Sequence, residues 1–180
     1  MTMKYKFILV ILVLVLAVGG VFWYLKGDKG SETTKNGDQT EDYPFTNPDL
    51  KLRYKDPALG FSVDYPEGFI VNDTGEDNVK ILVFSKTSSE ESFQIFIMPY
   101  DELGPITQER ILIDQPKIVI KDPQTVEIAG GEALVFFSKD TDIGDVREVW
   151  FVHQDRLYQA STYAKYDELL SKVMATFRFK

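Results

Sequence analysis

Hydrophobic and polar positions divide the chain into three parts. Phe7 to Leu25 is an apolar run of 19 residues without a charge, whereas residues 27–48 include no aliphatic side chain. From about Leu50 onward, short runs of alternating apolar and polar residues are separated by turn-forming residues. The pattern predicts a transmembrane anchor at 1–26, a flexible linker at 27–48 and one soluble domain at 49–180.

The apolar run has the length of a membrane-spanning helix. At 1.5 Å per residue its 19 residues extend for about 28 Å, close to the thickness of the bilayer hydrocarbon. Aromatic residues such as Tyr5 and Trp23 lie at its two ends, and Lys4 and Lys6 precede it. We therefore expect a single-pass protein of the cytoplasmic membrane. Its N-terminus would be cytoplasmic, its domain would lie outside, and the lipid bilayer would be the partner of its helix.

A cleaved signal peptide is the alternative for the same segment. Phe7–Leu16 has the length of a signal peptide's apolar region, and Ala17-Val18-Gly19 has the small residues of a cleavage site. Apolar sequence resumes at 21–25, which a signal peptide does not need, so a retained anchor is favoured over a secreted form. The 22-residue linker, as a flexible coil, would span roughly 26 Å root-mean-square.

Alternation in the domain predicts about six or seven strands, joined mostly as antiparallel hairpins. The segment 72–78 (NDTGEDN) is expected to be a loop, and tight turns are expected at Gly130-Gly131 and Gln154-Asp155. The expected strands are Leu59–Tyr65, Val79–Lys86, Ser92–Met98, Gln124–Ala129, Glu132–Lys139, Val146–His153 and Arg156–Ala164.

Two helices are expected to cover the sheet. Pro105 is placed to begin a short helix that ends before Pro116. The second helix closes the chain, because its apolar residues recur at helical spacing: Tyr166, Leu169, Leu170, Val173, Met174 and Phe177. Strands such as VKILVFSK are apolar on both sides, so the sheet is expected to be covered on both faces. The predicted fold class is α+β, an α/β/α sandwich preceded by one transmembrane helix.

Three segments carry a family resemblance: GFSVDYPEGF (60–69), AGGEALVF (129–136) and REVWFVHQDRLYQASTYAKYDELLSKVMATFRF (147–179). Together they resemble the PsbP-like fold family, which includes the extrinsic photosystem II subunit and a Ran-binding nuclear import factor. The resemblance covers roughly residues 57–180 and implies an antiparallel sheet of about six strands between helices. It transfers no functional residue, because the matching positions are turns and core residues, and a fold is a weak guide to function.

Charge and composition exclude several functions. Residues 1–48 carry five lysines and five acidic residues, so the excess of 23 acidic over 15 basic residues lies entirely in 49–180. An acidic domain without a basic stripe is not expected to bind nucleic acid. The absence of cysteine excludes disulfides, thiolate metal sites and cysteine nucleophiles.

Candidate catalytic and metal-binding residues are few. His153 is the only histidine, which argues against His-rich zinc chemistry and limits any Ser-His-Asp set to an unusual variant, and its place beside a turn favours a surface role. Asp140, Asp142 and Asp145 resemble a calcium loop, but glycine falls at loop position five rather than six and Phe151 at position twelve. We interpret this loop as an acidic hairpin end, with weak calcium binding as the alternative. The loop containing Asp73, Glu76 and Asp77 has the same interpretation.

The remaining patterns favour structure over chemistry. Neither adjacent acidic pair, Glu90-Glu91 or Asp101-Glu102, is expected to share a proton, because neighbours on a strand face opposite ways and loop residues face water. Asn72-Asp73-Thr74 fits a glycosylation acceptor, which would matter only in a eukaryotic secretory pathway. Trp150, Phe151, Tyr158 and Tyr163 are aromatic residues of the last strand pair, and we interpret them as core, with an exposed binding platform as the alternative.

No catalytic, cofactor-binding or metal-binding residue is assigned from the sequence, and no cofactor is expected. The leading hypothesis is a membrane-anchored extracytoplasmic binding or assembly module without catalytic activity, with an envelope protein as a possible partner. An envelope enzyme with a carboxylate-based site is the second hypothesis. A purely structural subunit of an envelope complex is the third.

Overall fold

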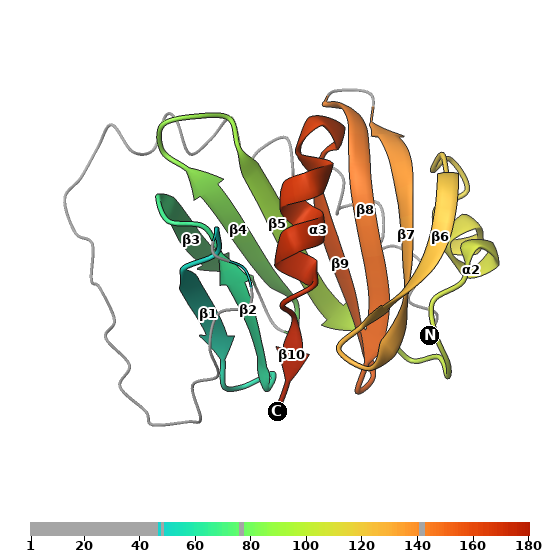
Figure 1. The fold of residues 1–180 in the computed structure, drawn as a ribbon. Helices are drawn as coiled ribbons and strands as arrows, with labels where there is room; N and C mark the ends of the chain where they lie inside the picture. Colours follow the sequence, from blue (N-terminus) through green and yellow to red (C-terminus); the bar gives the residue numbers. More distant parts are fainter. Residues whose placement is uncertain (1–46, 48, 76–77, 141–142) are drawn as a thin grey trace. The chain divides into compact units, whose positions relative to one another are not determined.

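Seven antiparallel strands form the larger of two sheets in the computed structural model, which describes residues 47, 49–75, 78–140 and 143–180 (Figure 1). Their order across the sheet is β3-β4-β5-β9-β8-β7-β6. The strands are β3 (Phe69–Thr74), β4 (Lys80–Lys86), β5 (Ser92–Pro99), β6 (Lys121–Ile128), β7 (Gly131–Asp140), β8 (Gly144–His153) and β9 (Arg156–Tyr163).

One face of this sheet, which we call the first face, is covered by a helix and a smaller sheet (Figure 1). The smaller sheet has three antiparallel strands in the order β1-β2-β10. The elements of this layer are β1 (Leu52–Asp56), β2 (Phe61–Tyr65), the 3-10 helix η1 (Ala164–Tyr166), α3 (Asp167–Met174) and β10 (Arg178–Phe179). The layer is therefore mixed rather than purely helical.

Aromatic side chains fill the space between the two layers on the first face. In the three stacked pairs, Phe61 comes from the small sheet and Phe177 follows α3, while the other four rings come from the large sheet. Stacked pairs of this kind contribute about 0.5–1.5 kcal/mol each beyond the burial of their area. The stacked pairs and their centroid separations are Phe61–Phe177 (4.9 Å), Phe84–Phe93 (4.4 Å) and Phe151–Tyr158 (4.9 Å).

The opposite, second face is approached by the long connection between β5 and β6. This connection carries α2 (Gln108–Asp114), which begins where the Thr107 hydroxyl accepts a hydrogen bond from the backbone N–H of Arg110. Ile111 points inward and is fully buried. Residues 105–109 lie against Thr125 and Leu134 of the large sheet, so α2 belongs to the layer of the second face.

Most of the predicted elements are confirmed. The chain is α+β with antiparallel sheets, and the strands expected from alternation are present within three residues of their predicted ends. The Gln154-Asp155 turn has positive φ at both residues, 46° and 58°, as a two-residue hairpin loop of type I′ requires. The closing helix buries Leu170, Val173 and Met174 as its periodicity predicted.

Three details of the prediction are wrong. Residues 72–74 belong to β3 rather than to a loop, because pairing with β4 outweighs the turn preference of Asn-Asp. The tight turn lies at Ala129-Gly130, since Gly131 already pairs with Ile128 in the ladder. Helix α2 begins only at Gln108, where the Thr107 cap starts it, and not at Pro105.

The strand count was also too low. The strands β1, β3 and β10 lack a clear alternation of their own; β1 and β3 pair with the strand that follows each of them, whereas β10 pairs with β2, far earlier in the chain. Among the described residues, no helix is long and apolar enough to cross a membrane, and the predicted span at Phe7–Leu25 lies outside them.

Candidate functional site

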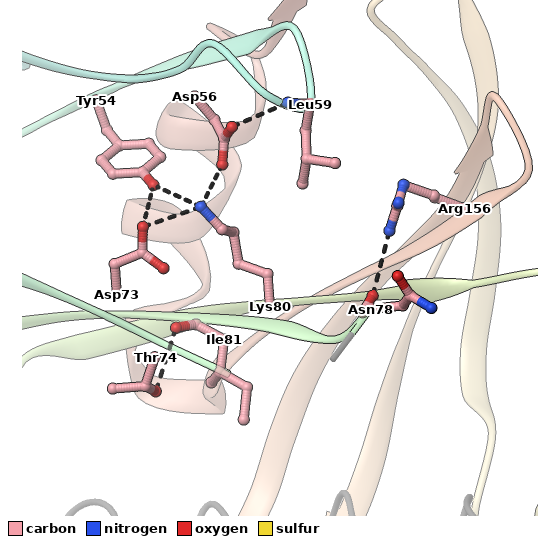
Figure 2. Close-up of polar contacts among 9 residues, drawn as sticks. All are labelled: Tyr54, Asp56, Leu59, Asp73, Thr74, Asn78, Lys80, Ile81 and Arg156. Atoms are coloured by element: carbon pink, nitrogen blue, oxygen red, sulfur yellow. Dashed lines mark hydrogen bonds and ion pairs between the residues drawn. The ribbon is translucent and has the colours of Figure 1, made fainter. Parts of the chain in front are cut away.

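The first candidate is a cluster of charged side chains between the two sheets (Figure 2). Its lysine, Lys80 of β4, places Nζ 2.5 Å from Oδ2 of Asp56, 2.9 Å from Oδ2 of Asp73 and 3.4 Å from the hydroxyl of Tyr54. The Tyr54 hydroxyl also donates to Asp73 at 2.8 Å, and Oδ1 of Asp56 accepts from the backbone N–H of Leu59. The cluster therefore joins β1 of the small sheet to β3 and β4 of the large one.

The electrostatics of this cluster indicate a structural role. Burial opposes the charge on Lys80, but hydrogen bonds to Asp56 and Asp73 outweigh it and raise the pKa of the ammonium. Burial and the hydrogen bond to Asp73 raise the pKa of the Tyr54 hydroxyl. Both groups thus keep their protons at neutral pH and have no tendency to exchange them. Asp56 is only 3% exposed, and its charge is tolerated there because Lys80 neutralises it.

The second candidate is Glu148, on the second face of the large sheet. Its carboxylate accepts hydrogen bonds from Oγ of Ser138 at 3.1 Å and from Nε1 of Trp150 at 3.0 Å. The residue keeps partial exposure, but its carboxyl group is surrounded by protein. Burial raises the pKa of Glu148 to about 7, the two hydrogen bonds oppose this rise, and the charge of Asp140 adds to it.

Polar side chains surround Glu148 without supplying a positive charge. Its partners across the strands are Phe136 and Ser161, and Ser161 in turn pairs with Gln94. In the part of the chain that the structure describes, Glu148 has no ion pair with a lysine or arginine. Gln159, only 4% exposed, has an Nε2 without a hydrogen-bond partner. Glu148 is therefore an acid that changes its charge near neutral pH.

The third candidate is a surface on the connection that carries α2. Glu109, Leu112 and Ile113 fall at i, i+3 and i+4 and share one face of the helix. Leu112 is 45% and Ile113 71% exposed. Glu109 also lines a hollow of about 200 Å³, together with residues 105–108 and with Thr125, Glu132, Ala133 and Leu134. We call the hollow and these three helical residues the crossing surface.

The structure separates the candidate residues that the sequence suggested. His153 stacks on Phe179 with ring centroids 3.4 Å apart, and burial lowers its pKa. Asp140 accepts from the backbone N–H of Ile143 as part of the hairpin, and Asp145 lies on β8. Asp142 lies outside the described residues, as do Glu76 and Asp77 beside Asp73. Within the described segments, no group of three or more metal-ligating side chains is close enough to hold a metal ion.

The acidic pairs are engaged separately rather than with each other. Glu90 forms an ion pair with Lys165 and Glu91 with Lys86, at 2.8 and 2.7 Å. Glu102 pairs with Arg110, and its neighbour Asp101 is exposed. Asn72-Asp73-Thr74 lies on β3 and not in a loop.

The aromatic residues of β8 and β9 are divided between the faces. Phe151 and Tyr158 belong to the first-face core, whereas Trp150 lies on the second face and is 4% exposed. Tyr163 is half-buried beside Tyr166. Trp150, Phe151 and Tyr158 are therefore core residues, as predicted. Together with Tyr163 they do not form a continuous exposed platform.

Sequence reasoning missed all three candidates. The sequence contains one signal for Glu148. In β8 this acid alternates with Val146 and Trp150, so it stands at a position where a buried apolar residue is expected. The Lys80 cluster joins residues 24 and 26 positions apart, and the pattern of a single strand does not show such contacts.

Comparison with known proteins supports the fold alone. No family model and no curated protein matches the chain. The solution structure of cyanobacterial PsbP (CyanoP) from Synechocystis matches with a TM-score of 0.53 and 14% identity, and it covers 78% of this chain and 98% of that one. The fold is PsbP-like. The expected resemblance is thus confirmed for the architecture, and at this identity it carries no functional residue.

Replacing Lys80 by methionine is expected to destabilise the protein by about 3 kcal/mol, because the buried charge of Asp56 loses its cation. Asp73→Asn should cost less than about 1 kcal/mol, since that carboxylate is exposed. Chemical denaturation measures both changes. In the double variant Asp56→Asn/Lys80→Met, the free energy of unfolding should fall by less than the sum of the falls in the two single variants, because the two side chains interact. Falls that simply add would contradict this interaction.

Ionisation of Glu148 is expected to make stability depend on pH. Because the pKa is raised in the folded protein, the stabilisation is fully present below about pH 4.5 and is lost as the pH rises through about 7. Between pH 5 and 8.5 the free energy of unfolding should fall by on the order of 2 kcal/mol more than in Glu148→Gln, which cannot ionise. Urea denaturation at several pH values measures this difference. Parallel profiles of the two proteins would contradict it.

Proposed function

We propose that the protein is a membrane-anchored binding or assembly module that works on the outer side of the cytoplasmic membrane. The anchor and tether come from the apolar run at Phe7–Leu25 and the polar linker after it. In this proposal the PsbP-like unit has no catalytic activity of its own and docks another envelope protein. It does not bind nucleic acid, because its charge is strongly acidic.

The crossing surface is the observation that carries this proposal. Six large apolar side chains are exposed in the part of the chain that the structure describes, and four of them lie on the connection between β5 and β6: Leu103, Leu112, Ile113 and Val119. Leu112 and Ile113 are neighbours on α2, and adjoining exposed apolar side chains favour a protein interface, whereas scattered ones are ordinary. Folding does not require them, since Ile106 and Ile111 already anchor this connection to the sheet.

Glu148 favours a second function, an envelope enzyme that uses a carboxyl group. An acid whose pKa is about 7 suits proton transfer at neutral pH. This function requires that a substrate can reach the carboxyl group, which protein atoms now surround. A diazoacetamide, which esterifies protonated carboxyl groups, should then modify Glu148 at pH 6 in the folded protein. Mass spectrometry that finds Glu148 unmodified would exclude this second function.

The proposed topology can be tested with single cysteines, because the natural chain has none. Thr87→Cys, exposed in the turn between β4 and β5, should react with a membrane-impermeant maleimide in intact cells. Thr2→Cys, in the head before the apolar run, should react only after the membrane is permeabilised. Gel shift of the labelled chain is the measurement.

Two results would contradict this topology. Labelling of Thr87→Cys only after permeabilisation would place the domain in the cytoplasm. Recovery of that variant in the medium, shortened at its N-terminus, would show a cleaved signal peptide and a secreted protein.

A further inference from the structure

Apolar side chains on α2 are left uncovered at the place where the chain is otherwise well packed. Ile111 and Ile106 are buried beneath the helix, and Arg110 is held by Glu102 and Asp114. Leu112 and Ile113, on the outer side, have no such role. The helix is therefore fixed in position by one face and leaves the other face exposed.

The hollow beside α2 is small. Pockets that bind drug-sized molecules are about 300–1,000 Å³, whereas this one is about 200 Å³. A space of this size takes one side chain rather than a whole ligand. Its lining combines apolar residues such as Ile106 and Leu134 with polar residues such as Thr107, Thr125 and Glu132.

Negative charge collects around the hollow without compensation. Glu109 and Glu132 line it, and Glu127 lies directly opposite Glu132 on the neighbouring strand. Like charges in such cross-strand positions are destabilising. In the described part of the chain, none of the three glutamates has a hydrogen bond or ion pair, and Arg110 is already occupied.

We propose that the crossing surface binds a segment of a partner protein in which a lysine or arginine is flanked by apolar side chains. The basic side chain enters the hollow between Glu109 and Glu132, and the flanking residues cover Leu112 and Ile113. This inference rests on the proposed function and specifies the chemistry of the partner. Cations combined with apolar contact are typical of the residues that dominate protein interfaces.

Other occupants fit the surface less well. The three glutamates are not close enough together to form a metal site in the described part of the chain. An anionic lipid surface would be repelled by their charge. Two copies meeting through this same surface would bring the carboxylates of one against those of the other, which costs energy rather than recovering it.

Site-specific photo-crosslinking tests the partner's chemistry. A benzophenone amino acid replaces Ile113 in the full-length, membrane-anchored chain, and the same amino acid at Ile70 on β3 is the control. Mass spectrometry then reads the sequence of the peptide attached to each position. The expected result is an adduct at position 113 whose attached segment contains lysine or arginine between apolar residues, with at least a fivefold lower yield at position 70.

The second part of the experiment reverses the charge of one glutamate that lines the hollow. Glu132→Lys should reduce the crosslink at position 113 at least fivefold. Because it places a lysine opposite Glu127, the melting temperature should stay unchanged or rise, so that unfolding cannot explain the loss. Glu90→Lys, the same charge change in the β4–β5 turn, should leave the crosslink unaffected.

The outcomes separate this inference from the proposed function. A protein adduct whose attached segment lacks a basic residue, or whose yield is unchanged by Glu132→Lys, overturns the inference and leaves docking intact. Adducts only to lipid, only to a second copy of this chain, or equal at positions 113 and 70 overturn both. Complete absence of an adduct at position 113 also overturns both.

Discussion

The aromatic layer buried between the two sheets is the constraint on which the rest of the structure depends. Strands of five, five and two residues are too short to form a stable sheet alone, so β1, β2 and β10 persist because they cover the large sheet. Phe61 provides the main contact, since its ring meets those of Tyr54, Tyr158 and Phe177. The position of β1 follows from this packing, and it brings Asp56 to Lys80.

Charged groups near this core are paired, whereas two facing glutamates of the second face are not. Arg53 and Asp64 form a two-bonded ion pair between β1 and β2 with almost no exposure, at 2.5 and 2.9 Å. Lys80 is likewise surrounded by oxygen atoms. Glu127 and Glu132, by contrast, face each other without a cation in the part of the chain that the structure describes. Folding gains nothing from this repulsion, which is why we attribute it to binding.

Local sequence patterns predicted the strands and helices that have one apolar and one polar face, and the turns that contain characteristic turn-forming residues. The hairpin of β8 and β9 and the helix α3 are examples, because alternation, the turn at Gln154-Asp155 and a 3.6-residue period each act within one short segment. Strand β1 pairs with the next strand but shows no clear alternation of its own, and β10 was missed because its partner β2 lies far away in the chain. The Lys80 cluster was missed for the same reason, and the exposure of Ile113 depends on how the chain crosses the sheet.

That crossing is a consequence of strand order. Because β9, β8 and β7 lie between β5 and β6, the chain must travel four inter-strand steps, about 19 Å at roughly 4.8 Å each. A connection that runs over a sheet can bury only one of its sides. The buried side needs apolar residues, and Ile106 and Ile111 supply them; the outer side needs none. Leu112 and Ile113 on that outer side are therefore not explained by the topology, and a partner that covers them accounts for both their exposure and the unpaired acids beside them.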